Sequence, residues 1–240
     1  MPAKPILHYC PSVTGASAYA VDLAASHHSR VTGWDLDAYR CREGAKGLNC
    51  TATRYVSFPT KAIYMTDEIT VCCWLYLTSS AFQGFFTKDD ASGNRSWSWD
   101  YYGGLWRWIG FDKSGSYGYA STAATLNKWT FLAGTFSHNA AILYKDGSFK
   151  SIGYSSYGGG LIYNSNPIGV GRYANYGLNI SDGVIDDCRV YKQALPANDI
   201  AALFARGPGY IDYDLHDDCE DESMLELPVA PEAPPLWFAQ

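Results

Sequence analysis

The chain has 240 residues, of which 47% are hydrophobic, 15% aromatic and 18% charged, and 23 of them are glycine. A single β-sandwich can reach this length, and many short strands joined by glycine turns suit this composition better than long amphipathic helices. The net charge of -6, with scattered basic residues, excludes nucleic acid as the main partner.

The start of the chain carries no apolar run of signal-peptide length, and no later segment resembles a membrane span. We therefore expect synthesis in a cytoplasm and no membrane contact. The cysteines have no metal-ligand spacing, and an odd number without an export signal favours free thiols. These residues are Cys10, Cys41, Cys50, Cys72, Cys73, Cys188 and Cys219.

Strand signals recur at short spacing along the middle of the chain. The predicted strands cover residues 54–58, 69–77, 84–87, 96–102, 105–111, 129–136, 141–145, 167–171 and 184–191. Lys145-Asp146-Gly147 lies between two alternating apolar runs, where a hairpin needs residues that tolerate positive φ. With so little helix between the strands, the pattern predicts an antiparallel sandwich or barrel.

One helix is predicted over residues 196–206, because Ile200, Leu203 and Phe204 recur at helical spacing after Pro196. The character of the sequence then changes. Residues 208–240 combine an acidic stretch with several prolines, a composition that cannot form a core of its own. We expect this segment to be an extended tail that docks on a neighbouring subunit, with Trp237 and Phe238 as its assembly contacts.

Four motifs in the second half resemble one known family. They are Asn127 to Phe136 (NKWTFLAGTF), Leu143 to Gly147 (LYKDG), Ile168 to Arg172 (IGVGR) and Gly183 to Tyr191 (GVIDDCRVY). Their order and spacing are similar to those of the laminin-G-like jelly-roll domains of the concanavalin A-like lectin/glucanase superfamily. The resemblance implies an all-β fold of two antiparallel sheets packed face to face, with a short helix after the last strand. The resemblance covers about residues 6 to 206 and excludes the tail. We therefore assign residues 1–207 to the jelly-roll domain and residues 208–240 to the tail.

The resemblance also implies a candidate calcium site, because members of this family often carry a structural calcium near the matching aspartates. Strict alternation along residues 184–190 places Asp186 on the same face as Val184, Cys188 and Val190. A carboxylate among apolar neighbours needs a cation or several hydrogen bonds. Asp22 is the candidate partner of Asp186 at such a calcium site. The alternative is that Asp186 accepts hydrogen bonds from backbone amides of the N-terminal segment.

Aromatic residues crowd two neighbouring predicted strands, where Trp97, Trp99 and Tyr101 would form one row. Such a row is either sandwich core, a stacking platform for glycans or a subunit interface. Residues 151–166 are rich in tyrosine and glycine, and Tyr154 and Tyr157 there are further candidates for glycan or interface contacts. The alternative for this segment is a long flexible connection.

No catalytic residues are predicted. Related glucanases place carboxylates alternately on one strand to flank a glycosidic bond, and no strand here has that pattern. Nucleophile motifs are missing as well, and the histidines have no metal or triad spacing. The sequence therefore favours binding or assembly over catalysis.

The leading hypothesis is a virion structural protein, made in a host cytoplasm and incorporated into a particle as a capsid decoration or fibre component. Its partners would be viral capsid or tail proteins and copies of itself, a homotrimer by analogy, with cell-surface glycans as further ligands. The first alternative is an extracellular, lectin-like carbohydrate-binding module. The second is a glycan-processing enzyme, which would need a cleft with convergent carboxylates.

Overall fold

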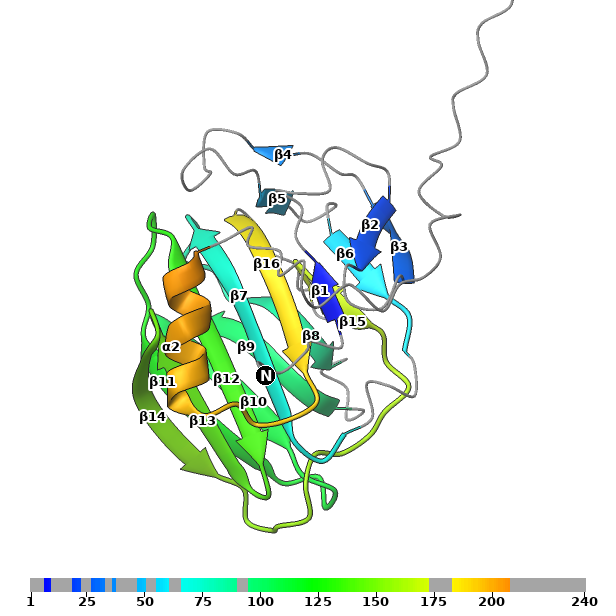
Figure 1. Ribbon diagram of the computed structural model, residues 1–240, viewed down its shortest axis with the longest axis vertical. Coiled ribbons are helices and arrows are strands. Elements are labelled where there is room, and N and C mark those ends of the chain that lie inside the picture. Colours follow the sequence, from blue (N-terminus) through cyan, green and yellow to red (C-terminus); the bar gives the residue numbers. More distant parts are fainter. Residues whose placement is uncertain are drawn as a thin grey trace, which may run out of the picture. The chain divides into compact units, whose positions relative to one another are not determined.

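The computed structural model describes residues 7–9, 19–22, 27–32, 36–37, 47–50, 55–60, 66–89, 95–172 and 183–207. The strands form two layers, and every strand pairing in the described residues is antiparallel. Figure 1 shows helix α2 (Ala197–Arg206) in front of one layer, with strands of the other layer behind it. Among the described residues, no helix has the length and apolar composition of a membrane span.

Sheet 1 is the layer covered by α2, and its strand order is β14-β13-β12-β7-β16-β1-β2. These strands are β14 (Ser148–Tyr154), β13 (Ala140–Lys145), β12 (Thr130–Ser137), β7 (Ile69–Leu77), β16 (Gly183–Tyr191), β1 (Leu7–Tyr9) and β2 (Tyr19–Asp22). Strand β5 (Gly47–Cys50) pairs with β16 and with the short β4 (Leu36–Asp37).

Sheet 2 is the second layer, with the order β11-β10-β9-β8-β15-β6-β3. Its strands are β11 (Tyr117–Ala123), β10 (Leu105–Phe111), β9 (Arg95–Tyr102), β8 (Gln83–Asp89), β15 (Ile168–Val170), β6 (Tyr55–Phe58) and β3 (His27–Thr32). Pairing between β2 and β3 connects the two sheets. The predicted two-sheet jelly-roll sandwich is confirmed.

The main core lies between the sheets and is dominated by tryptophan. Trp97, Trp99 and Trp108 are fully buried, and the ring centroids of Trp99 and Trp108 are 5.3 Å apart. Each indole N–H of Trp99 and Trp108 donates to a backbone carbonyl of sheet 1, at Val71 and Thr135 respectively. Large aromatic area is therefore buried without leaving these two donors unpaired.

A second cluster fills the space between sheet 1 and helix α2. Ile200 is the fully buried helix residue, and the ring of Phe204 stacks against Trp74 at 5.6 Å. The Thr70 hydroxyl on β7 accepts from the Leu195 amide and donates to the Gln193 carbonyl, which fixes the turn before the helix. The predicted helix is confirmed, and it occupies the outer face of sheet 1.

Asp146 and Gly147 form the β13–β14 turn with φ values of 51° and 73°. Both lie in the left-handed region that this two-residue turn requires, and the flanking Lys145 and Ser148 are paired. The Asp146 carboxylate also accepts from the Phe131 amide at 3.0 Å, which ties the turn to β12. The predicted hairpin is confirmed.

Strands β11 and β14 lie at opposite ends of the hydrogen-bonded order and meet along one side of the sandwich. A Cβ added at Gly153 on β14 would lie 1.8 Å from the Tyr119 carbonyl oxygen on β11. The Ser151 hydroxyl donates to the Ser121 carbonyl at 2.7 Å. The two edges therefore approach each other closely enough to require glycine at position 153.

The cysteines in the described residues are free and buried, as predicted: Cys50, Cys72, Cys73 and Cys188. The predicted tail, residues 208–240, lies outside the described residues, so its boundary and its docking stay predictions. Residues Trp237 and Phe238, named above as assembly contacts, fall within that segment.

A candidate ligand groove on the outer face of sheet 2

Strands β9, β10 and β11 carry a groove of about 540 Å³ on the face of sheet 2 that points away from the core. Alternation along β10 explains this placement, because Trp106 and Trp108 point into the core while Leu105, Arg107 and Ile109 line the groove. The other lining residues are Arg95, Tyr102, Gly103, Phe111, Tyr117 and Tyr119.

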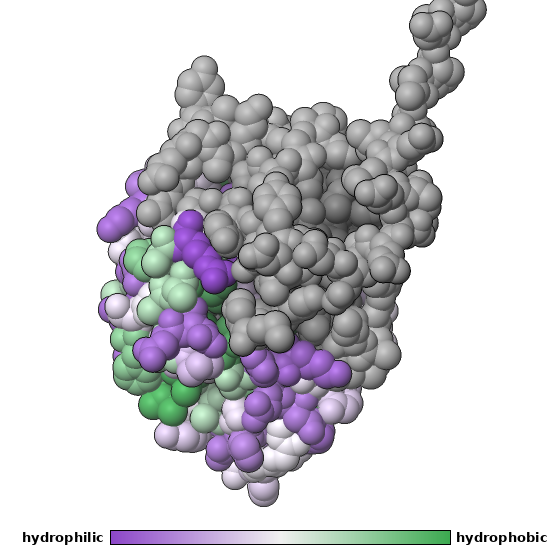
Figure 2. All heavy atoms as spheres, viewed as in Figure 1, coloured by the Kyte–Doolittle hydropathy of each residue, from purple (hydrophilic) through white to green (hydrophobic). Residues whose placement is uncertain are grey.

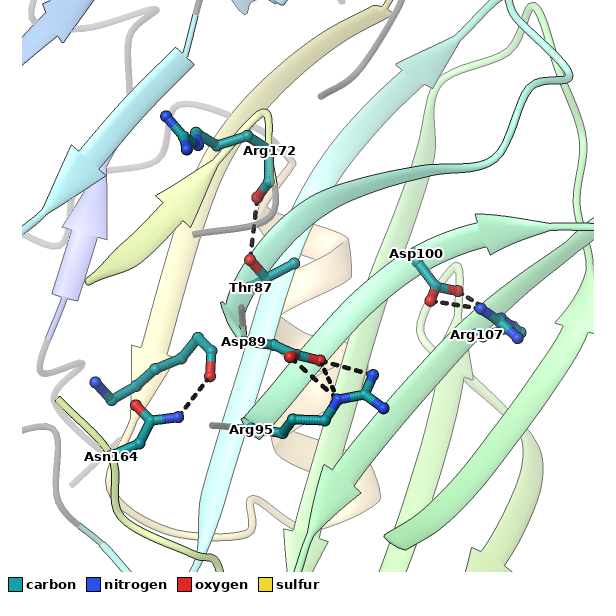
Figure 3. Close-up of polar contacts among 8 residues, drawn as sticks. Thr87, Asp89, Arg95, Asp100, Arg107, Asn164 and Arg172 are labelled. Atoms are coloured by element: carbon teal, nitrogen blue, oxygen red, sulfur yellow. Dashed lines mark hydrogen bonds and ion pairs between the residues drawn. The ribbon is translucent and has the colours of Figure 1, made fainter. Parts of the chain in front are cut away.

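At one end of the groove an arginine is held between a carboxylate and a ring. Arg107 pairs directly across the strands with Asp100, and its Nε and Nη2 atoms contact the two carboxylate oxygens at 2.5 and 2.6 Å. The guanidinium carbon lies 4.6 Å from the centre of the Tyr102 ring. Figure 3 shows the two-pronged contact, a geometry that fixes the orientation of the guanidinium plane.

A second arginine at the other end has the same kind of environment. The Arg95 Nε and Nη2 atoms lie 3.0 and 2.9 Å from Asp89 Oδ2, and its guanidinium carbon lies 4.2 Å from the centre of the Phe111 ring. Asp89 and Asp100 are both fully buried, whereas the Arg95 side chain is 33% exposed. The groove is therefore lined by guanidinium groups, while the carboxylates that they contact are buried. Figure 3 shows the contact of Arg95 with Asp89.

Three tyrosines form the accessible rim of the groove. Tyr102 is 55% exposed, Tyr117 57% and Tyr119 39%, whereas Ile109 and Phe111 on its floor are buried. Exposed aromatic faces next to fixed hydrogen-bond donors can hold a flat, hydroxyl-bearing ligand. Figure 2, by contrast, shows the helix side, where apolar and polar residues alternate over short distances around α2.

The row Trp97, Trp99 and Tyr101 does not form an exposed platform. Trp97 and Trp99 are fully buried and Tyr101 is 5% exposed, all within the main core. The three side chains are therefore part of the sandwich core, which was one of the predicted alternatives. The prediction that they form a glycan-binding or interface surface is wrong. The opposite face of the same strand carries the groove instead.

The candidates Tyr154 and Tyr157 are on the surface, with exposed fractions of 63% and 64%. They flank a segment that touches the start of β11, where the Ser156 amide donates to the Ser116 hydroxyl at 3.0 Å. Tyr117, at one end of the groove, directly follows Ser116. The structure thus places these two tyrosines on the surface beside the segment that contacts Ser116, and their contribution to binding stays a prediction.

Asp186 does not share a face with Cys188 and Val190. A bulge interrupts the pairing of β16 with β7 between Asp186 and Arg189, and Asp187 has a φ of 49°. Ile185, Cys188 and Val190 therefore face the main core, while Asp186 is paired with Trp74, which faces the helix-side cluster. The extra residue in the bulge shifts the alternation by one, so the predicted face was wrong.

The calcium prediction joins Asp186 to Asp22, which lies on β2. Strand β1 runs between them, because Tyr9 pairs with Asp22 on one side and with Cys188 on the other. In the part of the chain that the structure describes, no three His, Cys, Asp or Glu residues gather in a metal-binding arrangement. Calcium binding at Asp22 and Asp186 stays a prediction, which thermal unfolding with added calcium or chelator would test.

One more polar site lies where β8 meets the segment before β15. The Lys88 ammonium group is buried and donates to the Thr60 hydroxyl and, at 2.5 Å, to the Asn166 carbonyl. The Asn164 side-chain amide donates to the Lys88 carbonyl at 3.1 Å. Burial lowers the pKa of Lys88 to about 8. These hydrogen bonds attach the segment before β15 to strand β8.

The sequence of residues 51–201 matches the family described as the concanavalin A-like lectin/glucanases superfamily, of the Laminin_G_3 type. The chain belongs to this family. The match covers more than half of the chain and includes all four motifs from which the resemblance was drawn. No curated protein matches the sequence.

Many solved structures share the fold at low sequence identity. The receptor-binding domain of the botulinum neurotoxin C/D mosaic serotype has a TM-score of 0.67 at 15% identity, covering 85% of this chain and 51% of its own. The binding domain of Paraclostridial Mosquitocidal Protein 1 has 0.66 at 16% identity, covering 84% and 52%. The binding domain of botulinum neurotoxin serotype D has 0.65 at 14%, covering 85% and 52%. This chain spans about half the length of these structures. At this low identity, the similarity establishes a shared fold.

Sequence reasoning missed the residues that line the groove. Arg107 and Asp100 lie on different strands, and their pairing depends on the register of β9 against β10, which cannot be read from the sequence. A signal was nevertheless present, because Ser96, Ser98 and Asp100 alternate with the tryptophans of β9. A polar row opposite a buried aromatic row marks a sheet face that lies outside the core.

Proposed function

We propose that this protein is a non-catalytic, carbohydrate-binding adhesion module whose ligand occupies the groove on sheet 2. The observation that carries the proposal is the exposed rim of Tyr102, Tyr117 and Tyr119 beside two oriented arginines. Sugar rings offer apolar faces for stacking and hydroxyl groups for hydrogen bonds, and the groove offers partners for both.

The carboxylates near the groove support binding rather than catalysis. Asp89 and Asp100 are buried, and each accepts charge-assisted hydrogen bonds from an arginine. Glycoside hydrolysis needs one carboxyl group that can donate a proton and a second that acts as base or nucleophile, both accessible to the substrate. Carboxylates fixed beneath arginines are poorly placed for either step.

The comparisons support a binding function by analogy of fold alone. The family description includes lectins as well as glucanases, and the similar solved structures are titled binding or receptor-binding domains. Nothing in that likeness assigns a particular glycan. A test of glycan binding should therefore target the groove residues.

The test is binding of the full chain to a glycan array, followed by titration calorimetry with the best ligand. Tyr102→Ala and Tyr119→Ala each remove one exposed ring and should weaken binding by about 1–3 kcal/mol, the range for a contacting aromatic group. Phe149→Ala is the matched control, because Phe149 is equally exposed but lies on β14 of sheet 1. Equal affinities for all three variants would refute the groove as the site.

A second proposal concerns assembly, and its motivating feature is the sequence of the tail. The acidic, proline-rich residues 208–240 include Leu236-Trp237-Phe238, apolar residues suited to a docking contact. We propose that this segment attaches the protein to neighbouring subunits of a virion, as a capsid decoration or fibre component made in the host cytoplasm. Capsid proteins and further copies of the chain would then be its partners.

Light scattering coupled to size exclusion tests this second proposal. The full chain should form a defined oligomer, and Trp237→Ala with Phe238→Ala should shift it towards monomer while glycan binding is unchanged. A stable monomer for both proteins would refute self-assembly through the tail and leave the adhesion proposal intact.

A further inference from the structure

The groove has a one-sided charge pattern. Among the residues that the structure describes, its lining includes two arginines and no acidic residue, although the whole chain has a net charge of -6. The balancing carboxylates of Asp89 and Asp100 are fully buried. A ligand in the groove would meet guanidinium N–H groups and tyrosine hydroxyls before it met any negative charge.

Arg95 retains a donor group for a ligand. An arginine has five N–H groups, and the contacts of Arg95 with Asp89 involve its Nε and Nη2 atoms. Within the described residues, the remaining Nη1 group of Arg95 has no hydrogen-bond partner. Because the carboxylate fixes the guanidinium plane and a ring backs it, little side-chain entropy remains to be lost when a ligand binds.

The two arginines occur in equivalent settings, each with one buried aspartate and one aromatic ring. Arg107 and Phe111, the ring partner of Arg95, are four positions apart on β10, or about 13 Å at the usual rise of a strand. The apolar side chain of Ile109 lies between them. This spacing suits a ligand longer than one sugar ring, with a negative group near each end and an apolar ring face over the middle.

We infer that the ligand of this groove is an acidic oligosaccharide, whose carboxylate or sulfate groups bind the guanidinium groups of Arg95 and Arg107. This inference rests on the proposed carbohydrate-binding function and adds the class of sugar. Carboxylate and sulfate groups both present pairs of oxygens that can accept two hydrogen bonds from one guanidinium. The tyrosine rim would stack on the sugar rings between these groups.

The experiment compares matched pairs of immobilised glycans with the full chain, each acidic glycan beside its carboxyl-reduced or desulfated form. The acidic member should bind at least about tenfold more tightly, as expected for one or more charge-assisted hydrogen bonds. Its binding should weaken as salt is raised, whereas binding of the neutral member should not. The carboxylated and sulfated arms distinguish the two anionic groups.

Paired substitutions assign the effect to the arginines. Arg95→Gln with Asp89→Asn removes both charges at one end while keeping polar groups of similar size, and Arg107→Gln with Asp100→Asn does so at the other. Either pair should reduce the preference for acidic glycans by about tenfold. Lys113→Gln with Asp67→Asn is the matched control, since this ion pair at 2.5 Å lies outside the groove. Unfolding midpoints show which variants remain folded.

The outcomes separate the inference from the proposed function. Binding of neutral and acidic members with equal affinity, or a preference for acidic glycans that survives both paired substitutions in folded protein, would overturn the acidic-sugar inference while leaving carbohydrate binding in place. Failure to bind any glycan on the array would overturn both.

Discussion

Gly134 on β12 lies directly against the indole of Trp108 on β10, so that a Cβ at position 134 would come within 2.3 Å of the ring. The same relationship occurs in reverse at Gly110, where an added Cβ would lie 2.2 Å from the ring of Phe136. Each sheet thus supplies a glycine where the other supplies a large ring, which lets the layers pack closely at the centre of the sandwich.

Gly134→Val should therefore destabilise the protein, because neither the Trp108 ring nor the strand can move without disturbing the core. Overpacking of this kind costs about 1–3 kcal/mol and more where backbone must shift. Urea unfolding monitored by tryptophan fluorescence measures the change. Gly158→Ala is the control, since an added Cβ there meets nothing within 4 Å, and a Gly134→Val protein as stable as this control would contradict the prediction.

The buried pair of Asp187 and Arg189 should be sensitive to the loss of one partner. Arg189 Nε lies 2.7 Å from Asp187 Oδ1, and the two side chains are 6% and 3% exposed. Burial disfavours the charged guanidinium, but the Asp187 carboxylate outweighs this and holds the pKa of Arg189 above its ordinary value. Arg189→Met should cost about 3–5 kcal/mol of unfolding free energy, because it removes the guanidinium that balances the charge of a buried carboxylate.

Chemical denaturation of Arg189→Met and of the double variant with Asp187→Asn checks this. The double variant should be more stable than the single one, since its buried residue is neutral. Lys192→Met, at an exposed position just after β16, should change stability by less than about 0.5 kcal/mol. A single variant at least as stable as the double one would contradict the prediction.

Stability should depend on pH through Lys88. Its pKa is lowered to about 8 from the ordinary 10.5 because burial disfavours the charged ammonium group. Between these values the unfolded chain binds more protons at this site than the folded chain, so the contribution to stability rises as pH increases through that window. The difference in unfolding free energy between the natural protein and Lys88→Met should therefore move in favour of the natural protein from about pH 7 to about pH 9.5. A difference independent of pH would show that Lys88 titrates normally.

The buried thiols should be unreactive in the folded protein. Burial raises the pKa of Cys72 to about 12 and also raises the pKa of Cys50, Cys73 and Cys188, and the thiolate is the reactive form. Iodoacetamide labelling read by peptide mass spectrometry should leave these four unlabelled in buffer and label them in urea. Rapid labelling of Cys72 in buffer would indicate local opening between sheet 1 and α2.

The central strands, the β13–β14 hairpin and helix α2 could be predicted because their residues carry strong local signals. Ile69–Leu77 is apolar except for Thr70, and Asp146-Gly147 is a turn dipeptide. Strand β14 was absent from the predicted strands, although the turn at Asp146-Gly147 implied a strand after it, because most of its residues are exposed and give only a weak periodic signal. Strand β11 was missed because Gly118, Ala120 and Ser121 are too small to indicate a buried face.

The candidate site was harder to predict than the fold, for two physical reasons. Arg107 finds Asp100 only through the register of β9 and β10, which depends on how the tryptophans pack. The bulge at Asp187 needs a residue in the left-handed backbone conformation. Aspartate tolerates this conformation, but the presence of an aspartate does not predict it. Tertiary packing fixed both features, so alternation alone assigned Asp186 to the wrong face.

The close approach of β11 and β14 affects how this protein meets other molecules. An exposed sheet edge is a template on which a foreign strand can continue the hydrogen-bond ladder, a common start of aggregation. Here the Tyr119 and Ser121 carbonyls of β11 face Gly153 and Ser151 of β14, so each terminal strand blocks the other. Association along this side by strand addition is therefore disfavoured, and a partner approaching here must recognise side chains rather than backbone.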